Sequence, residues 1–239
     1  MDVTLDSIRD IKLFQSKSGY RFSVDSLLLY DFINLKKTGS IADLGAGSGI
    51  VGILLAKKYP SARVALLEVQ DSLVRLAEEN VARNRLEDRV RVIRCDLRNL
   101  TPGCLAGQGF DLIVSNPPFR KLKSGLLNIE EEKAVARHEI KLRLHELIDA
   151  ASCLLKAKGR FHIIYHPYRL LELMDTLKNK NLEPKRLRFV HSNTSSEAKM
   201  VLLEAMKMGR GGLKVDKPLY IYEQDGSYTD EMEDIYKSP

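Results

Sequence analysis

Two short segments carry the residue types that could do chemistry. Residues 41–50 read Ile-Ala-Asp-Leu-Gly-Ala-Gly-Ser-Gly-Ile, and residues 110–119 read Phe-Asp-Leu-Ile-Val-Ser-Asn-Pro-Pro-Phe. The first pattern is typical of a ligand-binding turn between a strand and a helix that begins near residue 50. Glycine permits positive φ and close backbone approach, and the free amides at a helix start offer donors to a ligand. We therefore expect Gly45, Ala46 and Gly47 to lie against a cofactor.

The glycine pattern leaves two kinds of cofactor open. Gly47, Gly49 and Gly52 also satisfy G-x-G-x-x-G, and Glu68 follows at the spacing of about 20 residues that a dinucleotide site requires. Asp43, two residues before the first glycine, favours the other choice. A carboxylate there would repel a pyrophosphate, but it could attract the ammonium group of a methionine moiety, directly or through water. We therefore favour S-adenosylmethionine over NAD, and a turn without any ligand is the remaining alternative.

Two further acids end the next two predicted strands. Glu68 can accept both hydroxyls of a ribose, and Asp96 can accept a hydrogen bond from the adenine amino group. Their neighbours Val69, Cys95 and Leu97 are expected beside the same cofactor. Either acid alone would more often be a solvated strand end. In this order after the glycine turn, both are predicted to bind cofactor.

The second segment predicts a rigid acceptor site, because an apolar strand runs directly into Asn116 and two prolines. An aromatic amine is a poor nucleophile and must be held in orientation. The Asn116 side-chain oxygen and the Pro117 carbonyl can accept its two N–H bonds and aim the lone pair at the methyl group. Phe119 offers a face on which adenine, cytosine or an amide can stack. The alternative is that Asn-Pro-Pro merely terminates a strand.

The elements that must position these residues follow a βαβ pattern, which predicts an α/β fold with a largely parallel sheet. The last two of seven strands are separated by a short polar stretch, so we expect an antiparallel edge hairpin. Helices with apolar residues at three-and-four spacing should cover both faces. The predicted strands are 40–44, 63–68, 90–94, 110–115, 159–165, 184–191 and 199–207, and the predicted helices are 49–58, 70–84, 143–156 and 168–179.

Composition predicts one globular domain, since 44% of the 239 residues are hydrophobic and 29% are charged. We divide the chain into an N-terminal extension packed on the core (1–39), the main domain (40–222) and an acidic tail (223–239). The tail holds six acids and one lysine, which is a charge of −5. Because the whole chain carries +6, the other 222 residues carry +11. Such an excess favours a polyanionic partner.

Other function classes find no support in the sequence. No stretch approaches the roughly 20 apolar residues of a membrane helix, and the N-terminus lacks a basic start followed by an apolar run. Cys95, Cys104 and Cys153 form no close-spaced pair, so no zinc or other metal site is expected. The chain is expected in the cytoplasm, with a monomer slightly favoured.

Basic residues mark two candidate contacts with RNA phosphates. The first lies in segment 120–142, which we expect to be a substrate-facing loop because it is long and weakly periodic. The second lies on the predicted sixth strand, and a solvated face is the alternative for both. These residues are Arg120, Lys121 and Lys123 in the first cluster, and Lys185, Arg186 and Arg188 in the second.

From about residue 20 to 222 the sequence resembles the class I, Rossmann-like methyltransferases with an Asn-Pro-Pro-aromatic motif, which methylate amino nitrogens. Three segments, 20–29 (Tyr-Arg-Phe-Ser-Val-Asp-Ser-Leu-Leu-Leu), 136–139 (Ala-Arg-His-Glu) and 197–200 (Glu-Ala-Lys-Met), look like the bacterial valine-tRNA adenine-N6 branch. That branch modifies the adenine beside the anticodon.

The resemblance implies S-adenosylmethionine as cofactor, S-adenosylhomocysteine as product and tRNA as partner. It also implies that Ser23 and Asp25 border the methionine end of the cofactor. Methylation of a guanine N2 in rRNA, or of a protein glutamine amide, remains as the alternative. A hypothesis from a different functional class is a binding module that holds the cofactor without turnover.

Overall fold

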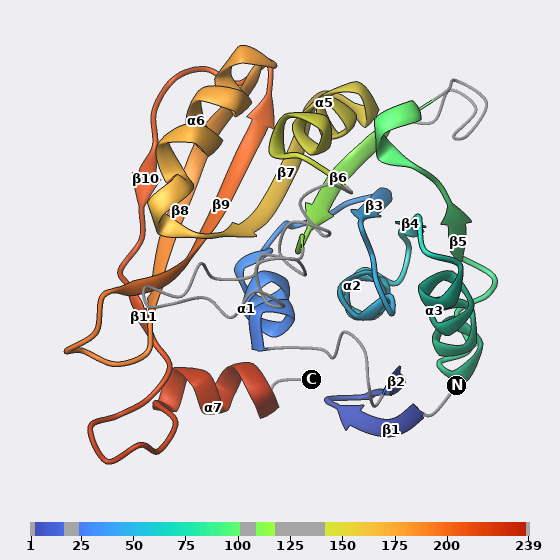
Figure 1. The fold of residues 1–239 in the computed structure, drawn as a ribbon, viewed down its shortest axis with the longest axis horizontal. Coiled ribbons are helices and arrows are strands. Elements are labelled where there is room, and N and C mark those ends of the chain that lie inside the picture. Colours follow the sequence, from blue (N-terminus) through green and yellow to red (C-terminus); the bar gives the residue numbers. More distant parts are fainter. Residues whose placement is uncertain (1–2, 17–23, 101–108, 118–141, 238–239) are drawn as a thin grey trace, which may run out of the picture.

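The computed structural model describes residues 3–16, 24–100, 109–117 and 142–237 (Figure 1). Seven strands form most of the central sheet: β3 Ser40–Leu44, β4 Arg63–Glu68, β5 Val90–Arg94, β6 Phe110–Ser115, β7 Leu155–Tyr165, β8 Leu182–His191 and β9 Ala198–Lys207. Their order across the sheet is β5-β4-β3-β6-β7-β9-β8. Neighbours from β5 to β7 are parallel, and β9 is antiparallel to both β7 and β8. The predicted α/β sheet is confirmed.

Helices cover both faces of this sheet, as predicted. They are α2 Ile50–Lys58, α3 Asp71–Arg83, α5 Leu144–Leu154 and α6 Leu170–Asn179. Successive strand residues point to opposite faces. Ile41 and Val64 therefore pack in one hydrophobic cluster with α2 and α3, whereas Ala42 and Ala65 pack in a second cluster with α5 and α6. The near-continuous apolar strands are what a sheet buried on both faces requires.

The boundary between α5 and β7 differs from the prediction. The helix ends at Leu154 and the strand begins at Leu155, rather than after residue 158. Leu155 pairs with Phe110, and the register then shifts before Arg160 pairs with Leu112. Lys158 takes a positive φ of 65° at this irregularity. A bulge of this kind is not visible in the apolar pattern, so the sequence places the strand start too late.

The sheet is wider than the seven strands predicted. Two short strands, β10 Lys214–Val215 and β11 Leu219–Tyr220, pair in parallel with β8, which gives nine strands within the described ranges. The antiparallel hairpin of β8 and β9 is present, but its outer edge is covered by this returning segment. A strand of two residues is too short to show a periodic pattern in the sequence. The unpaired backbone N–H and C=O groups of an edge strand favour pairing with a further segment.

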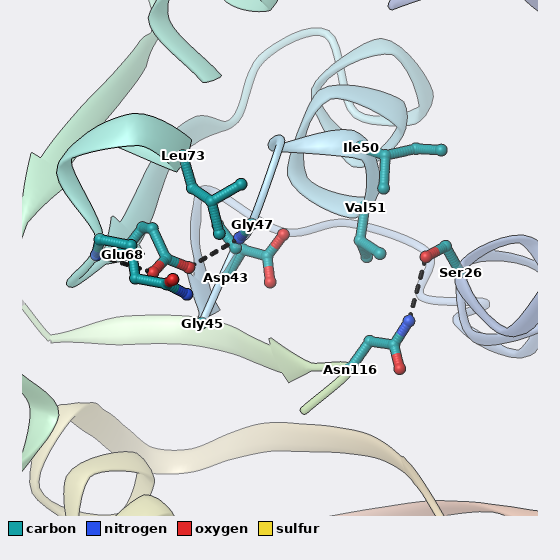
Figure 2. Close-up of a pocket in the computed structure, with 11 residues that line it drawn as sticks. Ser26, Asp43, Gly45, Gly47, Ile50, Val51, Glu68, Leu73 and Asn116 are labelled. Carbon is teal, nitrogen blue, oxygen red and sulfur yellow. Dashed lines mark hydrogen bonds between the residues drawn. The ribbon is translucent and has the colours of Figure 1, made fainter. Parts of the chain in front are cut away.

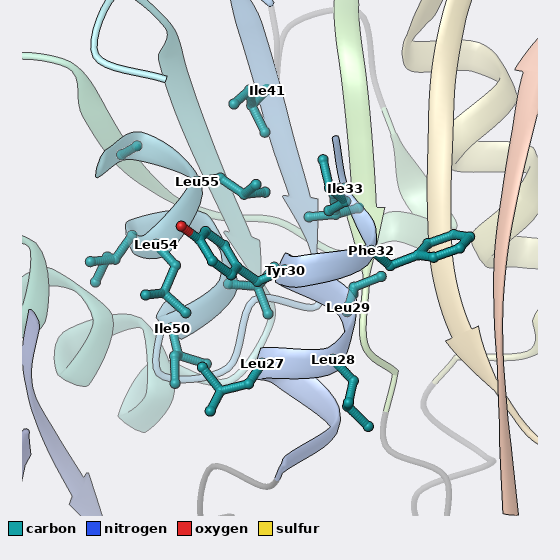
Figure 3. Close-up of a cluster of buried hydrophobic side chains, with 14 of the residues drawn as sticks. Leu27, Leu28, Leu29, Tyr30, Phe32, Ile33, Ile41, Ile50, Leu54 and Leu55 are labelled. Carbon is teal, nitrogen blue, oxygen red and sulfur yellow. The ribbon is translucent and has the colours of Figure 1, made fainter. Parts of the chain in front are cut away.

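Helix α1, Val24–Phe32, was not predicted. Its residues Leu27, Leu28 and Leu29 are at most 1% exposed, because α1 packs against α2, β7 and β9 (Figure 3). A helix that is buried on most sides is apolar on most sides, so it lacks the three-and-four pattern of a surface helix. Figure 3 shows this helix facing Ile50 and Leu54 of α2.

The N-terminal segment forms a hairpin of β1 Val3–Ile8 and β2 Ile11–Ser16 that α3 holds in place. The fully buried Asn80 of α3 accepts from the Phe14 amide (2.6 Å) and donates to the Phe14 carbonyl (3.1 Å) and the Ser48 carbonyl (2.9 Å). Asn84, one turn later, makes the same pair of contacts with Lys12 nearer the solvent. Asn80 therefore ties the hairpin to the turn that precedes α2.

The C-terminal helix α7, Asp230–Lys237, lies within the acidic tail and packs on α1 (Figure 1). Met232 and Ile235 point into the core, at 0% and 3% exposure. Arg9, between β1 and β2, donates through Nε to the Ile235 carbonyl at 3.0 Å. The N-terminal hairpin and the C-terminal helix therefore meet on the outer side of α1.

The basic side chains of the cluster on β8 contact other residues of the protein, and their candidate contact with RNA phosphates stays a prediction. Lys185 donates to the carbonyls of residues 210 and 212, Arg186 pairs with Asp216, and Arg188 pairs with Glu231 at 2.7 Å. Sequence alone could not show these partners, because the acids lie about 30 to 43 positions further along the chain.

No helix in the described ranges is long and apolar enough to cross a membrane.

We expect Asn80→Ala to lower the free energy of unfolding by about 3 kcal/mol, because it removes the partner of the buried Ser48 carbonyl and of the partly buried backbone groups of Phe14. Asn84→Ala is the matched control. Water can replace its contacts, so its cost should be about 1 kcal/mol. Urea unfolding of both variants measures the difference, and equal losses would show that Asn80 is no more important than its solvent-facing neighbour.

Candidate active site

The predicted glycine turn links β3 to α2. Gly45, Gly47 and Gly49 have φ values of 72°, 59° and 85°, a region that favours glycine over residues with a β-carbon. The amides of Gly45 and Ala46 both donate to the Leu67 carbonyl, at 2.9 and 3.0 Å, which holds the turn beside the end of β4. A β-carbon at Gly45 would meet no protein atom within 4 Å. The turn therefore presents bare backbone to open space.

Asp43 lies near the end of β3 and is 2% exposed. Its Oδ2 accepts from the Gly52 amide in α2 at 3.0 Å. Burial raises the pKa of this carboxyl to about 7, a shift that the nearby charge of Glu68 reinforces and the Gly52 amide opposes. An acid with this pKa changes its charge near neutral pH, and a cation beside it would favour the charged form.

Glu68, the last residue of β4, is also buried, at 6% exposure. Its Oε2 accepts from the Gly47 amide at 3.0 Å, and its Oε1 accepts from the amides of Val69 and Gln70, each at 2.9 Å. One carboxylate thus joins the glycine turn to the start of α3. Three amide donors compensate for the removal of its charge from water.

These residues line one pocket at the carboxyl ends of the parallel strands (Figure 2). The space between the lining residues is about 540 Å³, including its open mouth. Six lining residues were predicted as site residues: Asp43, Gly45, Ala46, Gly47, Glu68 and Asn116. Five were not: Ser26, Ile50, Val51, Gln70 and Leu73.

The missed residues carried only weak signals. Ile50, Val51 and Leu73 are ordinary apolar residues in the first turns of α2 and α3. Helices that start at the carboxyl edge of a parallel sheet bring their first turns to the ligand site, so their position could have been anticipated once the helix starts were known. Ser26 belongs to the unpredicted helix α1, and no pattern pointed to it.

The remaining predicted cofactor residues lie outside this lining. Val69 is 39% exposed, whereas Cys95 and Leu97 are buried in the second hydrophobic cluster. Asp96 faces Arg98, whose Nη2 lies 2.6 Å from the carboxylate, and this side-chain hydrogen bond lowers the pKa of Asp96. Asp25 is half-buried in the first turn of α1.

The second predicted motif ends β6 beside the pocket. The Ser115 hydroxyl donates to the Leu44 carbonyl at 2.7 Å, which fixes the end of β6 against β3. The next residue, Asn116, lines the pocket, and its Nδ2 donates to the Ser26 hydroxyl at 3.0 Å (Figure 2). Pro117 follows at the edge of the described chain. Ser23, Phe119, Arg120, Lys121 and Lys123 lie outside the described residues.

Buried carboxylates, bare backbone and apolar side chains share this pocket with a carboxamide. Such a lining can hold an amphipathic ligand that carries a cation, hydroxyl groups and an apolar surface. Among the described residues, no three His, Cys, Asp or Glu side chains are grouped as a metal site would require. The buried carboxylates, exposed backbone and apolar side chains of the lining match the ammonium, hydroxyl groups and apolar surface of S-adenosylmethionine.

Curated relatives agree with this chemistry. A protein of Porphyromonas gingivalis called tRNA1(Val) (adenine(37)-N6)-methyltransferase is 33% identical over 85% of this chain and 81% of its own. A protein of the same name from Pedobacter heparinus is 26% identical over 96% of this chain and 94% of its own.

Solved structures share the fold. A predicted O-methyltransferase from Agrobacterium tumefaciens has a TM-score of 0.71 at 22% identity and covers 89% of this chain and 95% of its own. A methyltransferase from Pyrococcus furiosus has a TM-score of 0.58 at 16% identity and covers 82% and 89%. At these identities the likeness concerns the fold alone.

The sequence also matches a family description, "Methyltransferase small domain", over residues 18–181. That range includes the glycine turn, both buried acids and the Asn116 turn, and it covers more than half of the chain. Together with a 33% identical relative over most of both chains, this match shows that the protein belongs to the methyltransferase small domain family.

Proposed function

We propose that this enzyme transfers the methyl group of S-adenosylmethionine to the exocyclic N6 amine of an adenine in tRNA, with adenine 37 of a valine tRNA as the target that its relatives' names indicate. The observation that carries the proposal is that Asn116 shares one pocket with Asp43, Gly45 and Glu68. A base held by Asn116 would therefore meet a cofactor held by the other three.

Different residues of the pocket bind different parts of the cofactor. The Asp43 carboxylate attracts the ammonium of the methionine moiety, the backbone of Gly45 and Gly47 contacts it closely, and Glu68 accepts from ribose. We keep Asp96 as the acceptor for the adenine amino group. Bound S-adenosylmethionine supplies a methyl group that its positively charged sulfur makes electrophilic, and S-adenosylhomocysteine is the product. Because that charge already activates the methyl group, the transfer needs no metal ion.

Asn116 and Pro117 orient the acceptor. The Asn116 Oδ1 and the Pro117 carbonyl each accept one N–H of the target amine, so that its lone pair faces the methyl group. The amine loses a proton after it has gained the methyl group, which makes a strong base unnecessary. We assign stacking on the base to Phe119, and phosphate contacts to Arg120, Lys121 and Lys123.

The edge of the sheet beside Asn116 offers a further surface for RNA. Because Ser115 pairs with Ile163, β6 and β7 leave the sheet at the same edge. The residues after β7 place Tyr168 there, 62% exposed, with its ring 5.5 Å from that of His166. Exposed aromatic rings stack on unpaired bases, and the positive charge of the main domain favours the RNA backbone. A tRNA substrate locates the reaction in the cytoplasm.

The primary test is transfer of labelled methyl to unmodified total tRNA, followed by digestion to nucleosides. We expect N6-methyladenosine from the wild type and about a hundredfold lower kcat from Asn116→Ala, since one preorganised contact to the reacting group is lost. Asn179→Ala, on the exposed end of α6, is the matched control and should be unaffected. Labelled rRNA or protein with silent tRNA would reassign the acceptor to a guanine N2 or a glutamine amide.

The affinity for S-adenosylmethionine should fall as pH drops below about 7, because the raised pKa of Asp43 means that its carboxyl is then protonated and neutral. One proton is linked to binding, so the dissociation constant should rise about tenfold per pH unit at most. The ligand-free protein has the opposite dependence. Its stability is lost as pH rises from the ordinary carboxyl range to about 7, since the buried group must then ionise.

Calorimetric titration of the cofactor between pH 5.5 and 7.5 measures this dependence. Asp43→Asn should bind weakly at every pH and show no slope. Asp111→Asn, at the opposite end of the sheet, where its carboxylate accepts from Gly39 and Ser40, is the control and should keep the wild-type slope. A slope that persists in Asp43→Asn would assign the titration to another group.

Tyr168→Ala should raise KM for tRNA about tenfold, because the stacking on one base is lost. The kcat and the cofactor affinity should stay unchanged. Tyr168→Phe should behave as wild type, because the ring is kept. Tyr228→Ala, an exposed tyrosine beside the acidic helix α7, is the matched control. Steady-state kinetics at saturating cofactor give the answer, and an unchanged KM in Tyr168→Ala would remove this surface from the RNA contact.

A further inference from the structure

The carboxamide of Asn116 is held from one side by helix α1. Its Nδ2 donates to the Ser26 hydroxyl at 3.0 Å, and Ser26 is 1% exposed. Both residues line the pocket, although 90 positions separate them in the sequence. In Figure 2 the amide nitrogen of Asn116 faces Ser26 and its oxygen points away from it.

The direction of this amide decides what Asn116 can do. The two ends of a carboxamide are chemically opposite, because the oxygen accepts hydrogen bonds and the nitrogen donates them. A target amine brings N–H donors, so it needs the oxygen. If the amide were turned by 180°, the amine would meet another N–H group. In the structure the nitrogen faces Ser26, which leaves the oxygen to accept from the amine.

Ser26 is itself fixed by the packing of α1. The adjacent Leu27 and Leu28 are buried in the core. At the other end of the helix, Arg186 donates to the Phe32 carbonyl at 3.1 Å and lies 4.1 Å from the centre of the Phe32 ring. A serine on a helix that is packed at both ends offers its oxygen at a constant place, as preorganisation requires.

We propose that Ser26 is a positioning residue for methyl transfer: by accepting from Asn116 Nδ2, it fixes the amide so that Oδ1 faces the target amine. This inference rests on the proposed function, since it assigns Asn116 to the acceptor amine. It adds a residue of the pocket lining whose hydroxyl contacts Asn116 and is assigned no contact with the reacting atoms. It also gives helix α1 a part in the reaction.

The test compares Ser26→Ala with Ser26→Thr and Ser115→Ala. Loss of one hydrogen bond that biases the amide should lower kcat about tenfold in Ser26→Ala, with KM for tRNA and the dissociation constant of S-adenosylmethionine within about twofold of wild type. Ser26→Thr keeps the hydroxyl and should restore kcat. Ser115→Ala also removes a buried hydroxyl, but that one donates to Leu44, so its kcat should stay near wild type.

A spectroscopic measurement tests the contact without any substrate. In ¹H–¹⁵N spectra, the side-chain amide protons of Asn116, assigned with Asn116→Ala, should exchange slowly in the wild type. They should exchange about tenfold faster in Ser26→Ala and slowly again in Ser26→Thr. This result does not depend on the identity of the acceptor, so it separates the contact from the proposed function.

Three results would overturn the assignment. They are unchanged amide exchange in Ser26→Ala, unchanged kcat in Ser26→Ala, and an equal loss of kcat in Ser115→Ala, which would indicate a general effect of buried hydroxyls near this turn. If wild type methylated no RNA, the proposed function would fail, and the amide exchange would still decide whether Ser26 holds Asn116.

Discussion

The hydrogen bonds of the Glu68 carboxylate are the contact on which the rest of the site depends. Its oxygens accept from the amides of Gly47, Val69 and Gln70, so they join the glycine turn to the residues that directly precede α3. Without such an acceptor, the amides of a left-handed turn would face a pocket without partners. In the proposed function, the remaining lone pair on Oε2 accepts from a ribose hydroxyl, so the shape of the turn is coupled to ribose binding.

A second layer of contacts supports this turn from outside. Asn80 connects the Ser48 carbonyl of the turn to strand β2, so the N-terminal hairpin is attached directly to the glycine turn of the pocket. On the acceptor side, α1 reaches Asn116 through Ser26 and is covered by α7. Both ends of the chain therefore pack around the site, and the segments outside the Rossmann-like sheet contribute to its geometry.

The parts of the fold that could be predicted are those that repeat a pattern. Strands β3, β4 and β5 alternate with helices α2 and α3, and a polar residue lies at or just after the carboxyl ends of β3, β4 and β6. Both the sheet and the lining residues Asp43, Glu68 and Asn116 therefore followed from the sequence. Helix α1 is apolar on most sides and β10 is two residues long, so neither carries a period. Ser26 could not be predicted for the first of these reasons, because a contact between positions 26 and 116 requires the packing of helix α1.

The two buried acids show why residue types alone do not assign roles. Asp43 and Glu68 end neighbouring strands and are similarly buried, at 2% and 6% exposure. Glu68 receives three backbone donors, whereas one, the Gly52 amide, is recorded for Asp43 within the described chain. Burial without equal compensation raises the pKa of Asp43, so its charged form is costly in the ligand-free protein and gains most from a cationic ligand. Glu68 therefore shapes the turn, and we propose that Asp43 favours a positively charged group on the ligand.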